Sequence, residues 1–351
     1  MSVLEFLVRS GATLTAISLS ACSPRATVDA GSTWIAPASP VASMQWTSDS
    51  QTLLYTDYEG DLSAVDLGSR SPRKLTEGVG AVHLVKTSSG DVVFFLRPVA
   101  GSVDEVTGSV DEYECVQTPL TGKVLGASRI VATAHAFSDI VVSAQGEAVA
   151  FLVEKGVMVV DVATGDSRVV AMDVAPVAFA PNASSLFGVM GPDYVVIERD
   201  GKATPAVEAA SGQVQAVTRW DADFPREVIV PDSDLLDVAT GEKRALLPGI
   251  QTNARSFAGV SGDALRPAAA YVWQEECLHY THVGQPPIEV CGEPQATLHR
   301  IDLETQGARP VASMPEIRLL AVSPDGLQLA TFNDDGHTLK PQIDLKGLPP
   351  L

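Results

Sequence analysis

The stretch VDVATGD at residues 160–166 returns almost unchanged as LDVATGE at residues 236–242. In both copies apolar residues precede an Asp, and a Gly follows that Asp four positions later. Glycine readily adopts the left-handed backbone conformation of tight turns, and Asp and Thr hydrogen-bond to nearby backbone groups. We therefore interpret the phrase as a β-hairpin turn that recurs because the fold recurs, rather than as two carboxylate sites.

Working outward from these two copies, a longer unit repeats along the chain. Each unit has an apolar strand, a polar turn and a second apolar strand, followed by a third strand that ends in the hairpin turn. The turn positions of the seven units are Asp66, Pro119, Asp161, Glu198, Asp237, Asp302 and Asp344. Four of the six steps between them are 37 to 42 residues long, close to the period of a four-stranded propeller blade.

The repeat predicts an all-β fold, namely a single β-propeller. Seven blades of four strands, called a to d from the centre outward, fit best, and six or eight are the alternatives. The expected propeller domain is 41–351, with blades at about 41–76, 79–133, 134–172, 173–208, 213–248, 253–313 and 315–345.

Three segments of these units resemble a known family. SPDGLQLAT at 323–331, VDVATGDSRVV at 160–170 and WTSDSQTLLY at 46–55 are similar to the TolB-type repeat, a WD-repeat-like unit of extracytoplasmic bacterial proteins. The resemblance covers about residues 41–345 and implies a propeller outside the cytoplasm. It concerns the repeat alone, since no stretch resembles the α/β N-terminal domain of TolB.

The last unit lacks an outer strand, because only KGLPPL follows Leu345. A propeller has to pair that remaining edge or leave a row of backbone groups without partners. STWIAP at 32–37 lies just before the first blade. We predict that it supplies the missing strand and closes the ring.

The N-terminus has the features of an export signal. GATLTAISL at 11–19 is uncharged and largely apolar, and LSAC at 19–22 resembles a bacterial lipobox. We expect residues 1–21 to be a lipoprotein signal peptide, Cys22 to be lipidated and residues 22–40 to form a tether that includes the closing strand. By resemblance to Gram-negative lipoproteins, Ser23 points to the outer membrane, facing the periplasm or the surface.

The composition and motifs exclude several functions. A net charge of −19 argues against nucleic-acid binding, which needs concentrated Lys and Arg. The sequence contains no G-x-S-x-G elbow, Walker A motif or Rossmann fingerprint. We therefore assign no catalytic residue, cofactor or metal.

Two long insertions fall between strands b and c, whose loops all emerge on one face of a propeller. The first, at 97–114, carries four acidic residues in its centre. We interpret it as a solvated acidic loop rather than a Ca²⁺ site, because the ligand spacing of an EF-hand is missing. Its candidate binding residues are Asp104, Glu105, Asp111 and Glu112.

The second insertion, at 275–294, contains two cysteines and the motif HYTH. Exported chains meet an oxidising compartment, so we predict a disulfide between Cys277 and Cys291 rather than a zinc site. Cys115 is then left as a buried thiol. The candidate binding residues of this loop are His279, Tyr280 and His282.

The central channel offers a second candidate site. Arg219, Arg255 and Arg318 lie on the innermost strands of three consecutive units. They could line one wall and bind an anion, but pairing with neighbouring acidic residues is the favoured interpretation.

Together these features predict a lipid-anchored, non-catalytic binding module of the cell envelope. Its b–c loop face would bind an envelope protein or another ligand, and it would meet the membrane only through its lipid. The alternative is a propeller enzyme (hydrolase, lyase or quinoprotein-like) with its site in the channel. The sequence does not define the oligomeric state.

Overall fold

The structure is a computed structural model of the chain. The residues it describes are 33–35, 37, 39–103, 110, 112–135, 140–153, 156–171, 173–191, 193–198, 200–208, 214–250, 255–263, 266–276, 279–280, 288–289, 295–315, 319–333 and 342–348. Only the backbone is described at 33, 34, 207, 208, 232, 255, 256, 275, 276, 279, 280, 288, 289, 295, 314, 315, 333 and 342.

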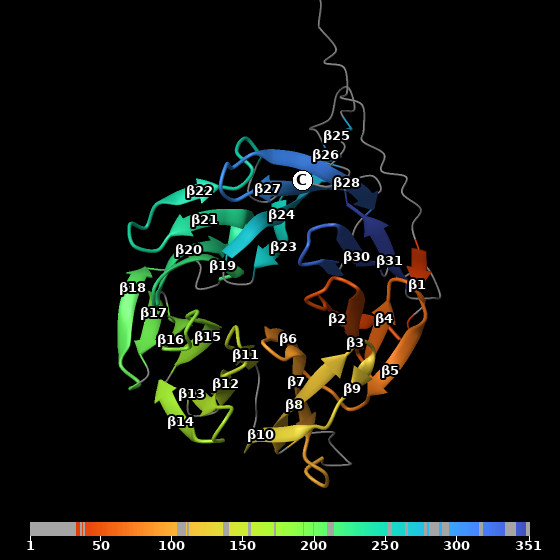
Figure 1. Cartoon of the computed structure of the whole chain (residues 1–351). Coiled ribbons are helices and arrows are strands. Elements are labelled where there is room, and N and C mark those ends of the chain that lie inside the picture. Colours follow the sequence, from red (N-terminus) through yellow and green to blue (C-terminus); the bar gives the residue numbers. More distant parts are fainter. Residues whose placement is uncertain are drawn as a thin grey trace, which may run out of the picture.

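Seven antiparallel sheets stand side by side around a common centre, so the predicted seven-bladed propeller is confirmed (Figure 1). Each sheet has four strands in the order a–b–c–d, and the sheet of blade 2 has one extra short strand, β9 (Val124–Leu125), on strand c. Among the described residues the only helical element is the 3-10 turn η1 (Pro231–Ser233).

Blade 1 consists of β2 (Val41–Trp46), β3 (Thr52–Asp57), β4 (Leu62–Asp66) and β5 (Pro72–Thr76), and blade 2 of β6 (Val82–Thr87), β7 (Gly90–Pro98), β8 (Tyr113–Thr121) and β10 (Arg129–Ala134). Blade 3 consists of β11 (Ile140–Val142), β12 (Ala148–Val153), β13 (Gly156–Asp161) and β14 (Ser167–Ala171), and blade 4 of β15 (Val174–Phe179), β16 (Ser185–Met190), β17 (Asp193–Glu198) and β18 (Ala203–Glu208).

Blade 5 consists of β19 (Ala216–Asp221), β20 (Phe224–Val230), β21 (Asp234–Asp237) and β22 (Lys243–Ala245), and blade 6 of β23 (Arg255–Asp263), β24 (Arg266–Glu276), β27 (Gln295–Asp302) and β28 (Ala308–Pro315). Blade 7 consists of β29 (Leu319–Val322), β30 (Gln328–Asn333), β31 (Gln342–Gly347) and β1 (Thr33–Ile35). A separate two-stranded hairpin pairs β25 (His279–Tyr280) with β26 (Ile288–Glu289).

The a–b turns of blades 1, 3, 4 and 7 share one hydrogen-bond pattern. In blade 3, Gly146 donates its N–H to the carbonyl of Ser143 at 2.8 Å, and Gly326 does the same to Ser323 in blade 7. The Ser143 hydroxyl accepts the N–H groups of Glu147 and Ala148, at 2.9 Å each. These bonds explain why Ser or Thr so often opens the turn in the sequence.

The c–d turns explain the repeated phrase that opens the sequence analysis. Asp161 Oδ1 accepts the N–H groups of Ala163 and Thr164, at 2.9 Å each. Gly165 donates its N–H to the Asp161 carbonyl at 2.8 Å and has φ 78°, in the left-handed region where glycine is favoured. The Asp side chain accepts backbone N–H groups in the same way at Asp66, Asp237 and Asp302.

The core consists of layers between blades. Successive side chains of a strand point to opposite faces, so each middle strand contributes to two layers. Phe187 of β16 packs toward blade 5, whereas its neighbour Leu186 packs toward blade 3. Burial on both faces is the reason why these strands are apolar throughout.

The strand β1 closes the ring, as the sequence predicted. It pairs antiparallel with β31 and becomes the fourth strand of blade 7, with Thr33 opposite Leu345 and Ile35 opposite Ile343. The Ile35 side chain is 2% exposed and packs in the layer between blades 7 and 1. Blade 7 is therefore built from both ends of the described chain.

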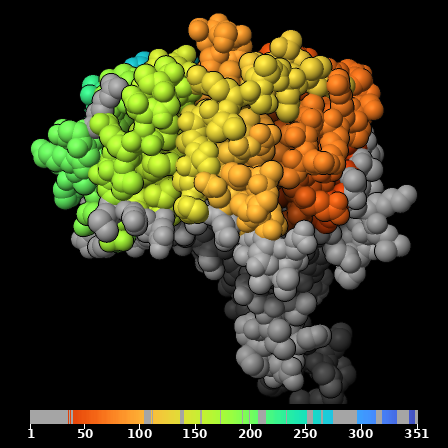
Figure 2. Space-filling model, turned by 90° about the horizontal axis from the view of Figure 1, so that it is seen from below, coloured from red at the N-terminus to blue at the C-terminus, as the bar shows by residue number. Residues whose placement is uncertain are grey.

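Strand direction alternates in every blade, which gives the disc two different faces. The a–b and c–d turns lie on one face, called here the turn face, and the b–c and d–a connections lie on the opposite one, called the b–c face. Figure 2 shows the disc edge-on, with blade 2 in orange to yellow and blade 3 in yellow-green on its wall. Among the described residues no helix is long and apolar enough to cross a membrane.

Candidate functional site

The first insertion joins β7 to β8 and so emerges on the b–c face. Its base continues the hairpin, because Val99 donates its N–H to the Glu112 carbonyl at 2.9 Å and the Ser102 hydroxyl donates to both Val99 and Glu112. An isolated bridge between Val103 and Val110 extends the pairing. Glu112 is thus fixed at the root of the loop, while the predicted residues Asp104, Glu105 and Asp111 lie outside the described residues.

The second insertion joins β24 to β27 on the same face. Within it, the hairpin β25–β26 sets His279 opposite Glu289 and Tyr280 opposite Ile288, as backbone positions only. Cys277, Cys291 and His282 lie outside the described residues, so the disulfide stays a prediction.

Cys115 is a buried thiol, as expected. It is fully buried on strand β8, and this burial raises its pKa to about 12. At neutral pH it is therefore an unreactive part of the core rather than a nucleophile.

A third feature of the b–c face was not predicted from the sequence. Tyr58, in the b–c turn of blade 1, is 76% exposed, the largest exposure among the described large hydrophobic side chains. Its backbone is held by a 3.0 Å hydrogen bond from its N–H to the Pro40 carbonyl. The face therefore presents an aromatic side chain in the blade next to the first insertion.

Of the three arginines proposed for the channel, only Arg219 has a described side chain, so the cluster itself is not tested. Arg219 of β19 is paired with Glu227 of β20, with 3.4 Å between Nη1 and Oε1. Arg255 is described only as a backbone position opposite Gln274, and Arg318 lies outside the described residues. On the inner strand β6, burial lowers the pKa of His83 to about 4, so its imidazole is neutral at pH 7.

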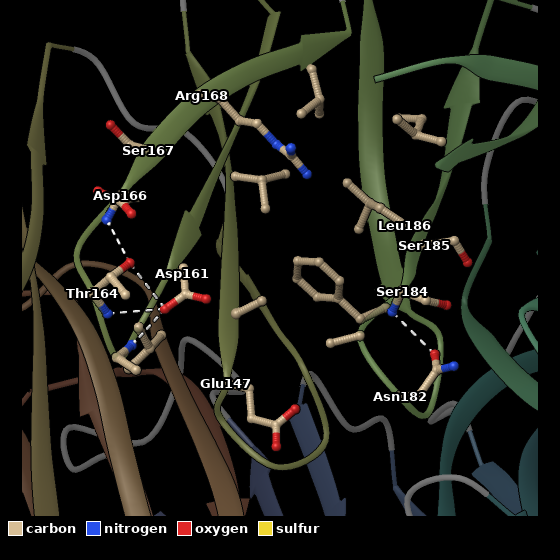
Figure 3. Close-up of a pocket in the computed structure, with 18 of the residues that line it drawn as sticks. Glu147, Asp161, Thr164, Asp166, Ser167, Arg168, Asn182, Ser184, Ser185 and Leu186 are labelled. Carbon is tan, nitrogen blue, oxygen red and sulfur yellow. Dashed lines mark hydrogen bonds between the residues drawn. The ribbon is translucent and has the colours of Figure 1, made fainter. Parts of the chain in front are cut away.

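A hollow among the described residues lies on the turn face, between blades 3 and 4. It has a volume of about 830 Å³. One wall is the c–d hairpin and strand β14 of blade 3, and the other is the a–b turn and strands β16 and β17 of blade 4 (Figure 3). We call it the 3/4 groove.

A hydrogen bond joins neighbouring turns at several seams of the turn face, but not the a–b turns of blades 2 and 3 or those of blades 3 and 4. Neighbouring turns are joined at other seams of the turn face, for example Ser48 N–H to Asp91 Oδ2 at 3.0 Å and Gly262 N–H to the Pro324 carbonyl at 2.8 Å. No hydrogen bond joins the a–b turns 143–146 and 180–183, all of whose residues are described. The 3/4 groove lies at this seam.

The 3/4 groove combines an apolar floor with charged edges. The floor includes Phe179, Leu186 and Ile197, which are buried in the layer between the two blades. The charged residues that line it are four acids and one base, namely Glu147, Asp161, Asp166, Glu198 and Arg168.

The four acids differ in what they already bind. Asp161 holds its own turn, and Glu198 lies 3.8 Å from Lys202. Glu147 and Asp166 have no ion pair among the described residues. In Figure 3 the Arg168 side chain reaches into the space between the two blades.

Sequence reasoning treated the c–d hairpin of blade 3 as scaffold only. The structure confirms its turn geometry but also makes it one wall of the 3/4 groove. The repeat pattern carries no signal for the hollow, because its width depends on how two sheets pack and not on the sequence of either turn.

The fold and its faces define the class of this protein as a seven-bladed β-propeller. Comparison with protein-family models gives no match, and comparison with curated proteins gives none either. Within the described part of the chain, no group of three His, Cys, Asp or Glu side chains is arranged to hold a metal ion.

Proposed function

We propose that this propeller is a non-catalytic binding module of the bacterial cell envelope, and that its partner binds the b–c face. One observation carries the proposal: both long insertions and the exposed Tyr58 lie on that same face of a closed ring. Large exposed aromatic residues are typical anchors of protein interfaces.

The scaffold supports this function because it holds the loop bases rigidly. The first insertion starts and ends in strands of nine residues, β7 and β8. An ion pair between Arg97 and Glu114 ties these two strands together next to the loop. Loops on a rigid scaffold are common places for recognition.

The anchoring half of the proposal rests on the sequence. LSAC at 19–22 and the resemblance to TolB-type repeats support export and a lipid on Cys22. Metabolic labelling with a palmitate analogue tests this directly. The wild type should be labelled and Cys22→Ser should not, and an unlabelled wild type would contradict the anchor.

The binding half is tested by affinity capture of the tagged protein from envelope extracts. Tyr58→Ser should reduce recovery of the partner at least fivefold without changing thermal stability, because the side chain is exposed. The matched control is Val169→Ser, which removes an apolar side chain that is 52% exposed on β14 of the outer wall.

A second variant tests the first insertion as a whole. Replacing 103–110 by a two-residue turn keeps the pairing of Val99 with Glu112 and should abolish capture. Unchanged capture by both Tyr58→Ser and the shortened loop would refute the b–c face as the binding surface.

A further inference from the structure

We infer that the 3/4 groove is a second binding site, and that it takes a short basic segment of a partner polypeptide in which Lys or Arg alternates with an apolar residue. It lies on the turn face, opposite the b–c face, so this inference does not depend on the proposed function.

The size of the groove fits such a segment. Binding sites for ligands of a few hundred daltons have volumes of about 300–1,000 Å³, and the 3/4 groove measures about 830 Å³. Its floor belongs to the rigid core: Leu186 is 2% and Ile197 is 1% exposed. An apolar side chain of the segment would add to this layer, next to the half-buried Val159 and Val170 of blade 3.

The charges around the groove select for a cation. Its lining carries four carboxylates against one guanidinium, within a chain whose net charge is −19. Glu147 and Asp166, the two acids with no ion pair to another described residue, come from different turns of blade 3. Lys and Arg side chains suit this surface, because their stems pack on apolar residues while the charged head reaches a carboxylate.

The remaining polar residues favour a polypeptide over a small organic cation. Ser167 and Arg168 line the blade 3 wall, and the exposed Asn182 lines the blade 4 wall. Amides and carbonyls of a peptide backbone match donors and acceptors distributed along two walls, whereas a compact cation would use only the carboxylates.

The test uses the purified protein and the peptide fluorescein-Gly-Lys-Leu-Lys-Gly-amide, labelled at its N-terminus so that both Lys side chains stay charged, with binding followed by fluorescence anisotropy. Saturable binding that weakens with added NaCl is expected, because the charges are exposed to solvent. The acidic peptide fluorescein-Gly-Glu-Leu-Glu-Gly-amide should not bind.

The internal repeat supplies matched control variants. Asp166→Lys reverses a charge in the groove, and Glu242→Lys makes the same change at the same hairpin position in blade 5. Ala163→Trp fills the groove, and its control is Ala239→Trp. The groove variants should weaken binding at least tenfold and the controls less than twofold.

Three results would overturn the inference. One is the absence of saturable binding by the basic peptide, and another is equal weakening by groove and control variants. The third is displacement of the peptide by lysine amide at equal concentration, which would assign the groove to small cations. Loss of capture by Tyr58→Ser, in contrast, reports on the b–c face alone.

Discussion

At the scale of single residues, the Asp of the c–d turn acts as a local anchor in blades 1, 3, 5 and 6. Asp302 shows it most clearly. Its Oδ1 accepts the N–H of Thr305 at 2.6 Å, the Thr305 hydroxyl at 2.9 Å and the N–H of Glu304 at 3.0 Å. The Thr305 backbone and hydroxyl bonds hold the pKa of this carboxyl below its usual value.

We expect Asp302→Ala to lower the free energy of unfolding at pH 7 by about 1 kcal/mol, as for one net hydrogen-bonded group. Folding lowers the pKa of Asp302, so the ionised carboxylate stabilises the folded state fully above about pH 4. This stabilisation is lost as the pH falls through the pKa that Asp302 has in the folded protein. Urea denaturation at pH 7 and pH 3 measures this. A difference between wild type and variant that is as large at pH 3 would contradict the anchor role.

A second prediction concerns the residue that follows the Thr of a c–d turn. It has a positive φ in every such hairpin, and it is Gly241 (φ 74°) in blade 5 but Gln306 (φ 62°) in blade 6. A side chain in this conformation costs about 1 kcal/mol. Gln306→Gly should therefore stabilise the protein slightly and Gly241→Ala should destabilise it, as measured by thermal unfolding. Changes of the same sign in both would be inconsistent with this explanation.

At the scale of elements, the closing strand is short but well buried. Ile35 lies in a layer with Ile343 and Phe332 of blade 7 and residues of blade 1. Removing most of a buried Ile side chain costs about 2–5 kcal/mol. Ile35→Ala should destabilise the whole propeller by that amount in urea denaturation, and Val169→Ala, on the exposed wall, should change little. A separate unfolding transition at a lower urea concentration would show instead that β1 detaches alone.

Elements differ in how well the sequence predicts them. The closing strand was predictable because an unpaired edge after Leu345 demands a partner, and STWIAP is the apolar segment nearest to blade 1. The extra strand β9 was not, because Gly122 turns β8 back on itself with φ 56°, where blades 1, 3, 5 and 6 have the Asp turn. Tyr58 was missed since exposure cannot be inferred from a turn sequence.

The 3/4 groove could not be predicted from the sequence either, because it lies between the elements of two blades. Asp161 and Gly165 were correctly interpreted as turn residues. Whether a turn also lines a hollow depends on the neighbouring blade, here on the turn that contains Asn182. That turn bonds forward to Asp223 of blade 5, at 2.8 Å, and not back to blade 3.

At the scale of the whole molecule, the state of the four cysteines tests the proposed lipidation and the proposed disulfide. A lipidated Cys22, a Cys277–Cys291 disulfide and a buried Cys115 predict no reactive thiol in the native protein. Unfolding without reductant should expose one thiol, and unfolding with reductant should expose three. Mass spectrometry after alkylation measures this. Two extra thiols without reductant would refute the disulfide.

The pairing of β1 with β31 also sets the order of events during folding. The ribosome makes Thr33 among the first residues of the propeller and its partner Leu345 among the last. Every other blade is completed by strands that follow one another closely, but this one has to wait for the entire ring. Contacts of such sequence separation form slowly, and open strand edges are prone to aggregation. The ring therefore cannot close until β31 has been synthesised, however early any single blade folds.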